Sequence, residues 1–182
     1  IMVTLQAQGV SQAISIPIGL IAALVLGLIP GLVNGVLVAK LRVPPFIATF
    51  GMYGIAYGFA EIISGNVPVS NLPPAVGFVG HGYLLYYFPW QPSVFKMFSF
   101  FKAPDNLTRE EIRQVVPLIP NVVVLSAIVI LIFGFILAKT RFGQHTYAIG
   151  GNLEASKRAG INVSRHLITI YMISSFFASM AG

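Results

Sequence analysis

The feature that most constrains this chain is an apolar run at residues 16–39 that contains no charged side chain. About 20 consecutive apolar residues are enough for a helix to cross the hydrocarbon core of a bilayer. Three further apolar runs cover residues 46–63, 121–138 and 167–182. Only 9% of the residues are charged, against about 25% in soluble domains, so lipid must cover much of the surface. We therefore predict an all-α, polytopic transmembrane helix bundle of four spans within one domain, residues 1–182.

The segment between the second and third runs, residues 64–119, is polar and aromatic rather than uniformly apolar. It contains "YLLYYFPW" at 83–90 and "FKMFSFFK" at 95–102, and aromatic clusters of this kind sit at membrane interfaces. Thr108 and Glu111 match a capping box, which predicts a short helix ending at Pro117. We expect an interfacial external insertion that does not span. The chain starts without a basic leader and stops inside an apolar run, so we expect an internal fragment of a longer protein.

The basic residues indicate which loops face the cytoplasm. If every run spans, the turn after residue 39 and the loop 139–166 lie on the same side. Together they hold most of the Lys and Arg residues: Lys40, Arg42, Lys139, Arg141, Lys157, Arg158 and Arg165. The positive-inside rule places this side in the cytoplasm and the loop 64–119 outside. The net charge of +6 is thus explained by membrane topology, and we predict no nucleic-acid partner.

Small residues predict how the spans pack. The first run carries one at every fourth position: Gly19, Ala23, Gly27, Gly31, Gly35 and Ala39. The second run repeats the spacing at Gly54 and Gly58, and the fourth at Ser175 and Ser179. Membrane helices associate through close backbone approach, which small residues allow. We therefore predict packing along these rows.

A candidate solute pathway combines one polar side chain with a row of aromatic rings. Asn34 lies one turn after Pro30 in the first run, and the second run carries Phe50, Tyr53 and Tyr57. Aromatic rings can stack on the apolar faces of sugars, although rings that face lipid or other helices give the same pattern. No run has an acid or base at its middle, which argues against ion-coupled transport and intramembrane catalysis. We predict no catalytic residue and no metal site.

The loop 139–166 contains signals for a short helix over residues 153–159. Asn152 is a good N-cap, Glu154 lies in the first turn, and Lys157 and Arg158 lie in the last turn. We expect Glu154 to pair with Arg158, Gly160 to supply a left-handed stop, and Gly150-Gly151 to form a flexible break before the helix. An isolated helix of this length is unstable in water, so it needs a partner to pack against.

The same loop carries a family resemblance. The segments "TRFG", "YAIGGN" and "AGINV" of the loop, together with "NGVLVAKLRVPPFIATFGM" at residues 34–52, resemble bacterial ATP-binding-cassette permeases for ribose, xylose, galactose and related sugars. In that family the helix in this loop is the coupling segment, which docks on the ATPase subunit. The resemblance assigns this role to six residues: Asn152, Glu154, Ala155, Lys157, Arg158 and Gly160.

The resemblance implies a membrane-spanning permease subunit that translocates a monosaccharide across the bacterial inner membrane and is not itself an enzyme. The implied partners are an ATP-binding-cassette ATPase subunit, a periplasmic sugar-binding protein, a second permease subunit in a homodimer, and membrane lipid. ATP and Mg would be bound by the ATPase, and this chain would hold no cofactor. An ion-coupled secondary transporter of a small polar solute is the alternative, and it would carry buried ionisable residues in its spans.

Overall fold

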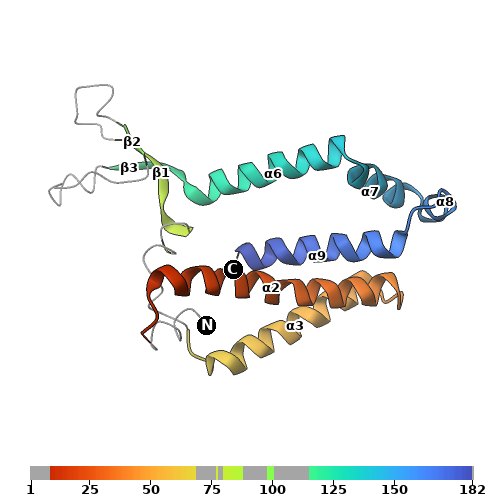
Figure 1. Ribbon diagram of the computed structural model, residues 1–182, viewed down its shortest axis with the longest axis horizontal. Helices are drawn as coiled ribbons and strands as arrows, with labels where there is room; N and C mark the ends of the chain where they lie inside the picture. Colours follow the sequence, from red (N-terminus) through yellow and green to blue (C-terminus); the bar gives the residue numbers. More distant parts are fainter. Residues whose placement is uncertain (1–8, 69–76, 78–79, 88–97, 101–114, 182) are drawn as a thin grey trace. The chain divides into compact units, whose positions relative to one another are not determined.

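The computed structural model describes residues 9–68, 77, 80–87, 98–100 and 115–181 (Figure 1). The chain divides into two compact units, Ile1–Asn71 with Leu137–Gly182, and Leu72–Ile136. The first unit holds helices α2 (Gln12–Ala39), α3 (Pro45–Ser64), α7 (Arg141–Gly151), α8 (Leu153–Arg158) and α9 (Val163–Ala181). The second holds a small sheet and most of helix α6 (Asn121–Lys139).

Three helices of the described residues are long and apolar enough to cross a membrane, namely α2, α3 and α6. They match the first three predicted spans. The fourth predicted span, 167–182, falls in α9, which has 19 residues but is not one of the three. Polar residues account for this, because the first turns of α9 contain Arg165 and His166 and its later turns contain several serines. The described part is therefore mostly helical, with three candidate spans rather than four.

Helices α2 and α9 run antiparallel and side by side in the first unit (Figure 1). A Cβ atom added at Gly31 would lie 2.6 Å from the Tyr171 carbonyl oxygen, and one added at Gly35 would lie 2.8 Å from Ile168 Cα. One added at Gly27 would overlap the Ser179 side chain. These positions of the predicted small-residue row therefore bring two helix backbones into contact, as expected where packing replaces the hydrophobic effect.

Hydroxyl groups reinforce this α2–α9 contact. Ser175 Oγ donates to the Gly27 carbonyl at 2.5 Å, and Ser179 Oγ donates to the Ala23 carbonyl at 2.7 Å. Ser164 Oγ donates to the Ala39 carbonyl at 3.3 Å near the other end of the pair. By contrast, a Cβ added at Gly54 or Gly58 of α3 would meet nothing within 4 Å among the described residues.

Helix α3 is bounded by conformational signals. Pro45 occupies the first turn, where its missing N–H costs no intrahelical hydrogen bond. Gly65 ends the helix with φ of +65°, and its N–H contacts the carbonyls of Glu61 and Ile62. In the turn between α2 and α3, Arg42 has a positive φ of 56°, which is uncommon for a residue with a side chain.

The second unit corrects the all-α prediction. Within its described residues, strands β1 (Tyr83–Tyr87), β2 (Phe98–Phe100) and β3 (Val116–Pro120) form an antiparallel sheet in the order β2-β1-β3. The aromatic residues of the predicted interfacial insertion also have high β-propensity, which explains why this segment forms strands. Pro117 lies inside β3 and does not end a helix. Thr108 and Glu111 of the predicted capping box lie outside the described residues.

Candidate functional site

The predicted short helix is present as α8, which covers Leu153–Arg158. The Asn152 side chain accepts a hydrogen bond from the Ala155 N–H at 2.9 Å and so caps the first turn. Gly160 has φ of +82°, the left-handed conformation that ends a helix without strain in glycine. Ser156 is buried and donates to the Asn152 carbonyl at 2.8 Å. The cap and the stop together define the two ends of α8, and Ser156 marks its buried side.

The charges of α8 differ in one respect from the prediction. Glu154 pairs with Lys157 at 2.7 Å rather than with Arg158. The hydrogen bond from Lys157 lowers the pKa of Glu154, as do the charge of Lys157 and that of Arg42 in the α2–α3 turn. Apart from Ser156, all residues from 151 to 160 are exposed. Helix α8 therefore presents an acidic and two basic side chains, with little of its surface used within the chain.

Helix α7 was not predicted. It begins after Thr140, whose side chain accepts from the Gly143 N–H at 3.5 Å, and Gly150 and Gly151 complete its last turn instead of forming a flexible break. A Cβ at Gly143 would overlap the Leu137 carbonyl oxygen, so only glycine fits where α7 follows the end of α6. The chain from residue 141 to 158 is therefore almost continuously helical.

One histidine joins α7 to α9. Thr146 Oγ1 lies 2.9 Å from His166 Nε2, and the rings of Phe142 and His166 have centroids 4.7 Å apart. Thr146 directs its only hydroxyl proton to the Phe142 carbonyl at 2.8 Å, so Nε2 of His166 must be the donor in this pair. Burial lowers the pKa of His166, with a smaller contribution from His145, and favours the neutral ring.

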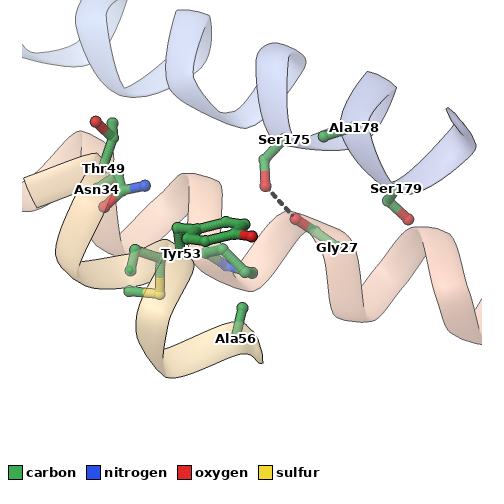
Figure 2. Close-up of a pocket in the computed structure, with 10 residues that line it drawn as sticks. Gly27, Asn34, Thr49, Tyr53, Ala56, Ser175, Ala178 and Ser179 are labelled. Atoms are coloured by element: carbon green, nitrogen blue, oxygen red, sulfur yellow. Dashed lines mark hydrogen bonds between the residues drawn. The ribbon is translucent and has the colours of Figure 1, made fainter. Parts of the chain in front are cut away.

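A pocket of about 300 Å³ lies between α2, α3 and α9, all in the first unit (Figure 2). Its lining contains no charged residue, and comprises Gly27, Pro30, Asn34, Thr49, Met52, Tyr53, Ala56, Ser175, Ala178 and Ser179. Of the four predicted pathway residues, Asn34 and Tyr53 line this pocket. Phe50 and Tyr57 do not; each stacks on a neighbour on α3, Phe50 on Phe46 and Tyr57 on Tyr53.

Asn34 is a buried polar residue that lines this pocket. The residue is only 9% exposed, and its Oδ1 atom is buried with no hydrogen-bond partner among the described residues. Buried polar atoms are normally paired, so an unpaired one needs an explanation. Thr49, Ser175 and Ser179 were not predicted as pathway residues, although the four-residue spacing of the two serines marked that face of α9 as packed. Among the described residues, no group of His, Cys, Asp and Glu could hold a metal ion.

Three candidate spans and an uncharged polar pocket between helices are features of a polytopic membrane protein. The chain matches, over residues 1–182, the family described as "Branched-chain amino acid transport system / permease component". It therefore belongs to this family of permeases, whose members are membrane transport subunits. No solved structure matches the chain with significance.

Curated relatives are sugar permeases. The chain is 34% identical over 146 residues to the galactose/methyl galactoside import permease protein MglC of Haemophilus influenzae, covering 80% of this chain and 36% of that protein. It is 32% identical over 147 residues to the ribose import permease protein RbsC of Escherichia coli strain K12, covering 81% and 37%. With the fructose import permease protein FrcC of Rhizobium meliloti it shares 28% over 146 residues, covering 80% and 34%. The chain thus spans a little over a third of the length of these relatives.

Proposed function

We propose that this chain belongs to the permease subunit of an ATP-driven importer that moves a monosaccharide across the bacterial inner membrane. The observation that carries the proposal is α8, a helix capped at both ends whose residues, apart from Ser156, are exposed. A helix this short is only marginally stable by itself, so packing against a second protein would stabilise it, and its exposed surface is available for that contact. The named functions of the sugar permeases above support the substrate class.

In this proposal α8 is the coupling helix, and an ATP-binding-cassette ATPase is its partner. ATP and Mg would be bound by that ATPase and not by this chain. Asn152, Ala155 and Gly160 would maintain the helix, while Glu154, Lys157 and Arg158 would contact the ATPase. Movement of α8 would reach α9 through the short link at residues 159–162, and would reach α7 through the cap at Asn152.

The remaining features of the transporter follow from the same proposal. Residues 167–182, most of which lie in α9, would be a fourth span, with loop 139–166 in the cytoplasm and the segment 64–119 outside. A periplasmic sugar-binding protein would deliver the sugar to the outer face, and a second permease subunit would complete a homodimer. The side chains proposed to line the pathway are Asn34, Phe50, Tyr53 and Tyr57.

The coupling role is tested by Glu154→Arg in the full-length permease co-expressed with its ATPase. The substitution replaces the acidic group of α8 and removes its pair with Lys157, so ATP-driven sugar uptake and ATPase co-purification should fall at least tenfold. Glu61→Arg is the matched control, because it makes the same charge change near the end of α3, on the face predicted to lie outside. Unchanged uptake and co-purification in Glu154→Arg would contradict the coupling role.

The energy source is tested separately. Uptake by the wild-type importer should stop when ATP is depleted and should continue when an uncoupler dissipates the proton gradient in ATP-supplied vesicles. The opposite pattern would favour the ion-coupled secondary transporter and would refute the proposed function.

A further inference from the structure

We propose that the pocket between α2, α3 and α9 binds an uncharged, hydroxyl-rich solute and that Asn34 is a residue that determines its specificity. The inference rests on the proposed transport function and identifies where the chain contacts its cargo. It also chooses between two solute classes, because the family description names amino acids while the curated relatives named above carry sugar names.

The first argument is the state of Asn34. The residue is only 9% exposed and lines the pocket (Figure 2), and its Oδ1 atom has no hydrogen-bond partner among the described residues. Rotation about the Cβ–Cγ bond exchanges the amide oxygen and nitrogen, so this group can present either an acceptor or two N–H donors to the pocket. A hydroxyl group is both donor and acceptor, so it can pair with either end of the amide.

The second argument is the hydrogen-bonding character of the other walls. Three hydroxyls already donate their only proton to the backbone: Thr49 Oγ1 to the Pro45 carbonyl at 2.9 Å, Ser175 Oγ to Gly27 and Ser179 Oγ to Ala23. Each oxygen can therefore offer the pocket acceptor capacity only. A wall rich in acceptors favours a solute that brings its own donors, as a sugar does with several hydroxyl groups.

The third argument concerns charge. None of the ten lining residues is ionisable near neutral pH, so a free amino acid would place a carboxylate and an ammonium group against neutral walls. A buried charge without an opposite charge is strongly disfavoured. Thr49, Ser175 and Ser179 would also present to the carboxylate hydroxyl oxygens whose protons are already donated to the backbone. The pocket therefore selects against zwitterions and for neutral polyols.

The fourth argument is the shape of the site. Pro30, Met52, Ala56 and Ala178 add apolar groups to the polar ones of the lining. The Tyr53 ring lies across the pocket (Figure 2). A sugar ring has apolar C–H faces between its hydroxyls, so such a mixed wall can contact both. The volume of about 300 Å³ is at the lower end of the roughly 300–1,000 Å³ typical of small-molecule sites, which suits a monosaccharide.

The role of Asn34 is tested in the full-length permease assembled with its ATPase and binding protein in proteoliposomes. Asn34→Leu keeps the side-chain size and removes both hydrogen-bonding groups. Uptake of labelled D-galactose, D-ribose or D-fructose, whichever the wild type imports, should fall about tenfold per ATP hydrolysed, which is the contribution of one neutral hydrogen bond. The amount of assembled complex should stay near wild type, and Asn34→Ser should recover part of the uptake. A fall in ATP hydrolysis parallel to uptake in both variants would show a structural role and overturn the assignment.

Solute contact is tested without ATP by protection from labelling. The chain has no cysteine, so Ala56→Cys in a cysteine-free full-length permease gives one reactive position in the pocket lining. Ile55→Cys is the matched control on the same helix, outside the lining. A water-soluble thiol reagent should label Ala56→Cys more slowly with the imported sugar present, and L-leucine should give no protection. Protection by leucine, or equal rates with and without sugar, would overturn the inference. If the wild type showed no ATP-driven uptake while sugar still protected Ala56→Cys from labelling, the proposed function would be refuted and the pocket assignment would stand.

Discussion

Gly31 gives the sharpest test of how α2 and α9 are held together. A methyl group at this position would lie 2.6 Å from the Tyr171 carbonyl oxygen and 2.9 Å from Met172 Cα, both of which are backbone atoms. Ordinary van der Waals contact begins near 3.4 Å, so α9 must move away by roughly 0.8 Å to accommodate Gly31→Ala. No side-chain rotation can relieve a contact between a methyl group and backbone atoms.

The change in stability is the sum of two destabilising contributions and one stabilising contribution. Overpacking of this kind costs about 1–3 kcal/mol. Separation also weakens the hydrogen bonds from Ser175 and Ser179, each worth about 0.6 kcal/mol between membrane helices. Replacing glycine by alanine in a helix recovers about 1 kcal/mol. Gly31→Ala should therefore destabilise the folded permease by about 1–3 kcal/mol. Gly134→Ala is the control, because its Cβ meets nothing within 4 Å, and it should be neutral or stabilising by up to about 1 kcal/mol.

The assay is denaturant unfolding of the full-length permease in detergent micelles, with double variants to locate the contact. At Gly27 an added Cβ overlaps only the Ser179 side chain, so Ser179→Gly should rescue Gly27→Ala. Ser175→Gly should not rescue Gly31→Ala, because the contacts with Tyr171 and Met172 backbone atoms remain. Wild-type stability of Gly31→Ala, or equal rescue in both double variants, would refute the backbone-contact explanation.

Two further predictions concern the loop beneath the spans. Asn152→Ala removes the cap on the Ala155 N–H and should destabilise α8 by about 1 kcal/mol; hydrogen exchange at Ala155 and Ser156 should accelerate about fivefold, whereas Asn152→Asp should keep the wild-type rate. His166, one residue before the predicted span 167–182, has a lowered pKa, so the unfolded chain takes up its proton first as pH falls. Its contribution to stability is complete above about pH 6.5 and is lost as pH falls from there toward the folded pKa. The unfolding midpoint should drop on acidification in the wild type and less in His166→Gln; identical pH profiles would contradict this explanation.

The features that could be predicted from the sequence were those set by local signals. The first three apolar runs predicted the helices α2, α3 and α6. Asn152 and Gly160 predicted both ends of α8, because caps and stops act within one turn. Asn34 stood out because it is a polar residue in an otherwise apolar span. The glycine row of α2 indicated a close contact, but it could not identify α9 as the partner.

The features that could not be predicted depend on distance along the chain or on choices between similar geometries. Ser175 is more than 120 positions from Tyr53, and only the folded chain shows that both line one pocket. Glu154 can reach a base at i+3 or i+4, and side-chain rotamers decide for Lys157. Helix α7 was missed because Gly150-Gly151 has low helix propensity, which the contacts of α7 with α9 override. The sheet was missed because aromatic residues suit both an interface and a strand.

The two candidate sites share one structural element, helix α9. Under the proposed coupling role, movement of α8 would therefore affect the pocket. Helix α9 follows α8 after a short link and contributes Ser175, Ala178 and Ser179 to the pocket. Because α9 meets α2 through backbone atoms at Gly31 and Gly35, the two helices cannot slide past each other without clashes. Helix α3 has no such restraint at Gly54 or Gly58 among the described residues, and only Ala48 is buried in it. Force applied through α8 would therefore move α9 and α2 together relative to α3, so that Asn34 and the two serines would shift as a unit past Tyr53.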